Sequence, residues 1–140
     1  YISVNKNGKV TLKKKAPAGT YVITVSKAGN INYEDAKTAV TITVKKAGQK
    51  ITAKNSAKKV KVSAVKKKAV SYTIGAKAKG SLSYQISSTP KNAGKYIRVT
   101  KKGKVTLKKG APKGTYVIRI TAKETSVYKK ATKNVKVTVK

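Results

Sequence analysis

The chain has 140 residues, of which 35 are Lys or Arg and three are acidic, so its formal net charge is +32. It contains neither Cys nor His, which excludes a disulfide framework and metal sites built on thiolates or imidazoles. Its apolar runs are all shorter than the ~20 residues that a membrane-spanning helix needs, so no membrane span is predicted. Val, Ile, Tyr and Thr are frequent, and these residues favour β-strands.

The first 45 residues predict four short strands separated by turns. Residues 6–9 contain the pair Asn7-Gly8, which suits the positive φ angles of a hairpin turn. Residues 16–19 place Pro17 and Gly19 at the second and fourth positions of another turn. Four strands leave one apolar face uncovered, made by Val4, Val10, Leu12, Tyr21, Ile23, Val25, Val40, Ile42 and Val44. Apolar patches of this size usually bind a partner, so we expect preceding residues, or strand swapping with another copy, to complete this half.

Residues 46–140 divide into seven runs in which apolar and polar residues alternate, as in strands with one buried face. The apolar positions of the runs are Val60, Val62 and Val65; Val70, Tyr72 and Ile74; Leu82, Tyr84 and Ile86; Ile97 and Val99; Val105 and Leu107; Tyr116, Ile118 and Ile120; and Val135, Val137 and Val139. Turn sequences at residues 78–81, 101–104 and 111–114 separate several of them. No stretch has a sustained helical period, so the sequence predicts an all-β sandwich of about seven strands.

A long phrase occurs twice. Residues 8–23 read GKVTLKKKAPAGTYVI and residues 103–118 read GKVTLKKGAPKGTYVI. Aligned without a gap, residues 1–45 and 96–140 are identical at 24 of 45 positions. The period of 95 residues is the size of a sandwich domain. We therefore expect a tandem repeat, with residues 46–140 as a complete unit and residues 1–45 as the C-terminal half of a preceding one.

Several of these segments resemble one family. GKVTLKKGAPKGTYVIRITA with the closing VKVTVK, GTYVITVSKAGNINYEDAKTAVTITV in the first copy, and KVKVSAVKKKAVSYTI and GSLSYQISS are similar to the bacterial Ig-like repeats of extracellular proteins of Gram-positive bacteria, particularly clostridia. The loop ETSVYKKAT at residues 124–132 departs from the Gly- and Asn-containing loop of that family. The resemblance implies an Ig-like β-sandwich, neighbouring Ig-like repeats, and a cell-surface or cell-wall location. It also implies a role as a spacer, anchoring or adhesion module.

The sequence offers little for catalysis. General acid–base chemistry needs positioned groups that titrate near the working pH, and residues 46–140 contain a single acid, Glu124. Glu34 and Asp35 are adjacent, so on a strand they would face opposite sides. We predict no catalytic residue, no metal site and no cofactor.

The lysine content is the one strong functional signal. Residues 46–140 carry 27 Lys and Arg against Glu124, a net charge of +26, whereas a magnitude of ~2–8 is enough to keep a small domain soluble. A single-sign charge of this size attracts polyanions. The clusters that we expect to bind them are Lys58, Lys59 and Lys61; Lys66, Lys67 and Lys68; Lys101, Lys102 and Lys104; Lys108 and Lys109; and Lys129 and Lys130. Under the family resemblance, the nearest polyanion is an anionic wall polymer of the teichoic acid type.

Two other functions stay open. The chain could be an adhesion module for a host glycan or protein, although it has no Trp and the pattern turns Tyr72, Tyr84 and Tyr116 inward. It could also bind nucleic acid without sequence preference, because Lys is a point charge suited to phosphates and only two residues are Arg.

Overall fold

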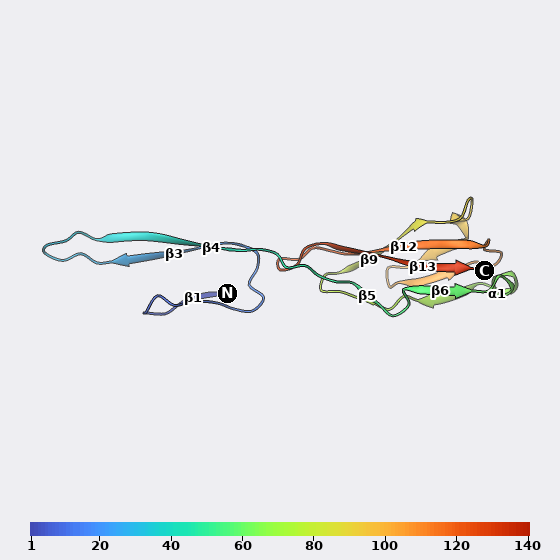
Figure 1. Ribbon diagram of the computed structural model, residues 1–140, viewed down its shortest axis with the longest axis horizontal. Coiled ribbons are helices and arrows are strands. Elements are labelled where there is room, and N and C mark those ends of the chain that lie inside the picture. The colour runs from blue at the N-terminus through green and yellow to red at the C-terminus, as the bar shows by residue number, and fades with distance from the viewer. The chain divides into compact units, whose positions relative to one another are not determined.

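The computed structural model describes residues 1–140, which fall into two compact units, Tyr1–Ala47 and Gly48–Lys140 (Figure 1). Both units are built from β-strands, and the prediction of an all-β fold is confirmed.

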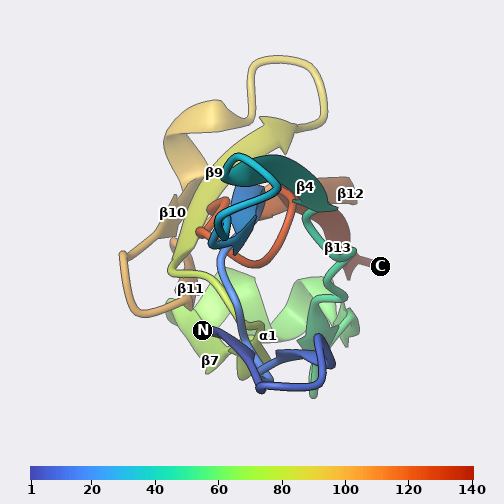
Figure 2. The same ribbon diagram turned by 90° about the vertical axis from the view of Figure 1, so that its left-hand side faces the viewer.

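The second unit is a two-layer sandwich. Its four-stranded sheet has the order β6-β13-β12-β9, with β6 at Ala57–Val60, β13 at Ala131–Val139, β12 at Gly114–Ala122 and β9 at Leu82–Ser88. Its three-stranded sheet has the order β10-β11-β7, with β10 at Ile97–Val99, β11 at Lys104–Leu107 and β7 at Val70–Thr73. The end-on view in Figure 2 shows β12 and β13 on one side of the core and β7 and β11 on the other.

The pairing within these sheets is that of an Ig-like sandwich. All neighbours are antiparallel except β6, which lies parallel to β13. The strand before β6, β5 (Thr52–Ala53), pairs instead with β8 (Ala76–Lys77), which follows β7. The second unit thus begins beside the three-stranded sheet and then crosses to the four-stranded sheet, and the seven strands of its two sheets have an Ig-like order.

One predicted strand is partly wrong. The alternation through Val60, Val62 and Val65 was expected to be a strand edge, but β6 ends at Val60 and a short helix, α1 (Val62–Lys67), follows. The N–H of Lys140 donates to the carbonyl of Val60 at 3.0 Å, and the N–H of Val62 donates to the carbonyl of Lys140 at 2.8 Å, so contact with the end of β13 continues up to the first residue of α1. Val62 and Val65 are three residues apart, the spacing of one helix face, and Val65 is completely buried. A second helical turn, η1, spans Gly94–Tyr96.

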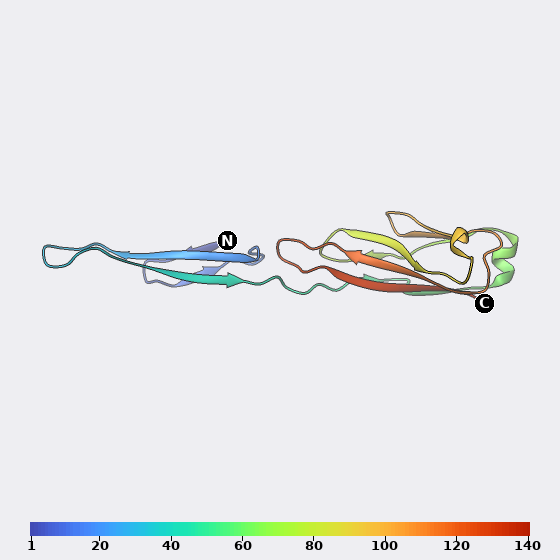
Figure 3. The ribbon, with the colours of Figure 1, turned by 90° about the horizontal axis from the view of Figure 1, so that it is seen from above.

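The core of the second unit lies between its two sheets. It is made by the inward positions of β11, β12 and β13 together with residues from β6, β10, α1 and the connecting loops: Ile51, Val60, Val65, Ile74, Ala93, Ile97, Val105, Leu107, Ala111, Tyr116, Ile118, Ile120, Ala122, Val135, Val137 and Val139. The strands β12 and β13 run side by side along their whole length (Figure 3). Tyr116 is fully buried, as predicted, whereas Tyr72 and Tyr84 pack at the edge of the core and are half-buried.

The first unit contains two hairpins. They pair β1 (Ile2–Val4) with β2 (Val10–Leu12) and β3 (Gly19–Lys27) with β4 (Ala36–Val44). The registers repeat those of the second unit: Ile2 lies opposite Leu12 as Ile97 lies opposite Leu107. The four strands therefore correspond to β10, β11, β12 and β13, and the first unit has no equivalents of β6, β7 and β9.

Candidate polyanion-binding site

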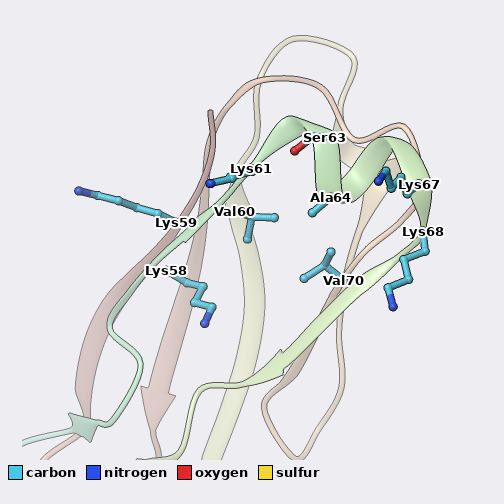
Figure 4. A pocket seen from close by; sticks show the side chains of 9 residues that line it. All are labelled: Lys58, Lys59, Val60, Lys61, Ser63, Ala64, Lys67, Lys68 and Val70. Atoms are coloured by element: carbon cyan, nitrogen blue, oxygen red, sulfur yellow. The ribbon is translucent and has the colours of Figure 1, made fainter.

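A pocket of about 510 Å³ opens at the end of the second unit where α1 lies. It lies between β6 and β7, which belong to different sheets, and α1 connects the two strands. Because the helix reverses the chain direction, the lysines before it and those after it line the same opening (Figure 4). We call this opening the lysine pocket; its residues are Lys58, Lys59, Val60, Lys61, Ser63, Ala64, Lys67, Lys68 and Val70.

The centre of the lysine pocket is apolar. The side chains of Val60, Ala64 and Val70 point toward one another in Figure 4, and Lys58 and Lys68 lie on either side of them. Lys59 points away from the centre. A ligand in this pocket would contact methyl groups below and ammonium groups at the rim, so the arrangement suits an anion that carries some apolar surface.

The charge of the pocket is not balanced by its own lining. Five of the residues that line it are Lys and none is acidic. The single acid of the second unit, Glu124, lines a different pocket together with Lys123 and Lys130. Several like charges without a neighbouring opposite charge produce a positive potential that concentrates anions.

The remaining predicted lysines do not line this pocket. Lys66 is on α1 but does not line the opening. Lys108 and Lys109 directly precede Gly110. The N–H of Gly110 donates to the carbonyl of Val65 on α1 at 2.9 Å. That hydrogen bond holds the turn between β11 and β12 against α1, so this pair of lysines adds to the charge at the same end of the unit.

Two predicted clusters lie elsewhere. Lys101, Lys102 and Lys104 are in and beside the turn between β10 and β11, before β11 runs toward the α1 end. Lys129 and Lys130 follow β12, whose nine residues separate them from its α1 end by about 30 Å. The carbonyl of Lys129 accepts a hydrogen bond from the Nε2 atom of Gln49 at 2.8 Å. The thirteen lysines are thus spread over both ends of the unit.

Sequence reasoning did not find the apolar part of the pocket. Val60 and Val70 were assigned to strands facing the core, and Ala64 was not singled out. The one available signal was the spacing of Val62 and Val65, which fits a helical turn between two strands better than a continued strand.

The structure offers little to other kinds of ligand site. No three His, Cys, Asp or Glu residues lie close enough together to hold a metal ion. No helix has the length and hydropathy needed to cross a membrane. A further pocket of about 470 Å³ is lined by Tyr128, Gln49 and three lysines, Lys50, Lys77 and Lys79, among others.

No protein-family model matches the chain, and no curated protein is significantly similar to it. Among solved structures, it is similar to mouse protocadherin-24 EC1-3 (16% identity, TM-score 0.46) and to Drosophila N-cadherin EC1-4 (17%, 0.49), with 99% of this chain covered in each. It is also similar over 99% of its length to a SusE-like surface located polysaccharide binding protein from the heparin utilisation locus of Bacteroides thetaiotaomicron (16%, 0.43). The chain spans 51%, 38% and 22% of these three chains, respectively. The fold assignment rests on the strand order described above.

Proposed function

We propose that the chain is a non-catalytic part of an extracellular protein at the surface of a Gram-positive bacterium. Its Ig-like units act as spacers, and the lysine pocket anchors them by binding an anionic cell-wall polymer of the teichoic acid type. The observation that carries this proposal is the lysine pocket itself, whose lining contains five Lys residues, an apolar centre and no acidic residue.

A repeating phosphate polymer matches this charge arrangement. Each Lys ammonium group is a compact charge that interacts well with a single phosphate, without the planar geometry that Arg requires. One chain of linked phosphates can contact Lys58 and Lys68 on the two sides of the pocket at once, and then continue toward Lys108 and Lys109. Linked charges bind more tightly than free ones, because the second contact is made within an already formed complex.

The spacer role follows from the sandwich. Its interior is filled by aliphatic residues and Tyr116, and no charged or other polar residue is buried there. In this sandwich β6, near the start of the unit, lies parallel to the last strand, β13, so the chain enters the unit at one end and leaves it at the other. Such units are well suited to be joined in series, which is the arrangement that the repeated sequence predicts.

The proposal can be tested with two charge-matched variants of the full chain. In the first, Lys58, Lys59, Lys61, Lys67 and Lys68 are all replaced by Gln. In the second, the same number of charges is removed away from the pocket, at Lys101, Lys102, Lys104, Lys129 and Lys130. Both variants and the wild type are co-sedimented with Gram-positive cell walls, native or stripped of teichoic acid, over a range of salt concentrations.

We expect the pocket variant to lose at least tenfold in affinity for native walls at physiological salt, and the control variant to lose less than threefold. Binding to stripped walls should be weak for all three proteins. An equal loss in both variants would mean that net charge alone causes binding, and the pocket would then have no special role. Tighter binding to duplex DNA than to native walls at the same salt would favour the nucleic-acid alternative.

A further inference from the structure

The first unit has the strand register of a complete sandwich but an uncovered apolar face. Val40 is 47% exposed, whereas its counterpart Val135 is fully buried. Leu12 is 44% exposed, whereas its counterpart Leu107 is fully buried. The same nine apolar positions form this face in both units, so we name it the acceptor face: Val4, Val10, Leu12, Tyr21, Ile23, Val25, Val40, Ile42 and Val44.

The second unit shows what covers the equivalent face. There β9 pairs with β12, β7 pairs with β11, and β6 pairs with β13. All three covering strands lie within residues 48–95, which we call the first-half segment. In the first unit, β3 pairs only with β4, and β2 pairs only with β1. The edges of β2, β3 and β4 that would pair with a first-half segment are therefore free, in addition to the apolar surface.

Two glycines of the first unit, Gly8 and Gly19, lie at positions where a first-half segment would make close contact. Their counterparts in the second unit show these contacts. There, a Cβ atom built on Gly103 would lie 2.8 Å from the Cζ atom of Tyr84, so this ring packs directly on the turn. The counterpart Gly8 has nearly the same φ, +76° against +74°, but nothing lies within 4 Å of it. In the same way a Cβ on Gly114 would lie 2.6 Å from Pro90, and its counterpart Gly19 has nothing near it. The first unit thus has open positions that match a Tyr and a Pro of the first-half segment.

We propose that the acceptor face binds one occupant, a polypeptide segment with the strand pattern of residues 48–95. The segment adds a strand to each of β2, β3 and β4, covers the nine apolar side chains, and places an aromatic ring over Gly8. This inference does not depend on the lysine pocket or on any wall polymer.

Strand swapping within residues 1–140 covers only part of the acceptor-type surface. These residues contain two regions with such a face, residues 1–47 and 96–140, and one first-half segment. Exchange of this segment between copies of residues 1–140 therefore leaves one such face per copy uncovered. Covering both faces takes a further segment of the same strand pattern.

Disulfide formation can test the register of this contact, because the chain has no Cys of its own. In the second unit Gln85 lies opposite Arg119, whose counterpart in the first unit is Thr24. The full chain carrying Thr24→Cys is mixed with a synthetic segment of residues 48–95 carrying Gln85→Cys, in a glutathione redox buffer. The control segment carries Ser83→Cys instead. Ser83 lies opposite Thr121 in the second unit, and the counterpart of Thr121 is Ser26, which lies two residues after Thr24 on β3.

We expect the Gln85→Cys segment to form the mixed disulfide at least tenfold faster than the Ser83→Cys segment, because directly opposite residues have Cβ atoms ~5 Å apart and diagonal ones ~7–8 Å. Hydrogen exchange of the amides in β3 and β4 should slow on addition of the segment without Cys. A segment with Tyr84→Ala should bind at least tenfold more weakly, because it lacks the ring that would cover Gly8.

Equal disulfide rates for the two segments, or unchanged hydrogen exchange in β3 and β4, would overturn the proposal. Faster formation of a homodimer through Thr24→Cys than of the mixed disulfide would also overturn it, and would mean that a second copy covers the face. The readout is specific to the first unit, because the engineered Cys of the full chain lies only there.

Discussion

The hydroxyl of Tyr116 donates a hydrogen bond to the carbonyl oxygen of Pro112, 2.9 Å away. Tyr21 makes the same bond to Pro17 at 2.8 Å. In each unit the bond holds the turn before the long strand against the first residues of that strand, as the tyrosine corner does in Ig domains. The bond explains why the repeated phrase keeps Pro, Gly and Tyr in fixed order, since the Tyr reaches back to the residue four positions earlier.

Replacing Tyr116 by Phe should destabilise the second unit by about 1–2 kcal/mol. The substitution keeps the packing of the ring and removes only the hydrogen bond, which leaves the carbonyl of Pro112 without this donor. Urea unfolding followed by circular dichroism measures the change. A loss below about 0.3 kcal/mol would show that this bond contributes nothing to the stability of the fold.

Tyr72 should respond in the opposite way. Its hydroxyl is buried and has no hydrogen-bond partner, so it carries a desolvation cost without compensation. Replacement of Tyr72 by Phe is expected to leave stability unchanged or to raise it by up to about 1 kcal/mol. The same urea titration, run beside Tyr116→Phe, distinguishes the two hydroxyls. A clear loss of stability in Tyr72→Phe would mean that this hydroxyl has a partner in solution.

The strands could be predicted from the sequence more completely than the site. Alternation along β12 and β13 is strict, and the repeat confirms their register, because the same pairs recur 95 residues apart. The helix α1 begins at Val62, whose N–H bonds the carbonyl of Lys140, 78 residues further along the chain, and local alternation contains no information about this contact. The lysines of the pocket were visible in the composition. The apolar centre was not, because Val60 and Val70 meet only after α1 has reversed the chain.

The pKa of Tyr72 is raised by burial, and so is that of Tyr84. A raised pKa in the folded state means that the fold favours the neutral phenol over the phenolate. The free energy of unfolding therefore keeps its full value below pH 10, the ordinary pKa of Tyr, and decreases as the pH rises from there through the folded-state pKa. We expect Tyr72→Phe to move the midpoint of alkaline unfolding to higher pH. Both proteins carry the same lysines, so the difference between their two midpoints reports on Tyr72. Identical midpoints would contradict the prediction.

Two glycines with similar backbone angles should differ in their tolerance of a side chain. Gly103 has φ +74° and supports the ring of Tyr84, whereas Gly110 has φ +81° and its nearest contact, Cε1 of Tyr96, would lie 3.7 Å from an added Cβ. The counterpart of Gly110 in the first unit is Lys15, which has φ +67°, so a side chain is accommodated in this conformation.

Gly110→Ala should therefore cost only the backbone strain of about 1–2 kcal/mol. Gly103→Ala should cost a further 1–3 kcal/mol or so, because the new methyl group displaces the Tyr84 ring from the turn. Thermal and urea unfolding of the two variants give the difference, and tyrosine ring signals in the NMR spectrum show whether Tyr84 has moved. Equal losses in the two variants would mean that the ring yields without cost. The close contact at Gly103 could then not be used to identify the segment that fits over Gly8.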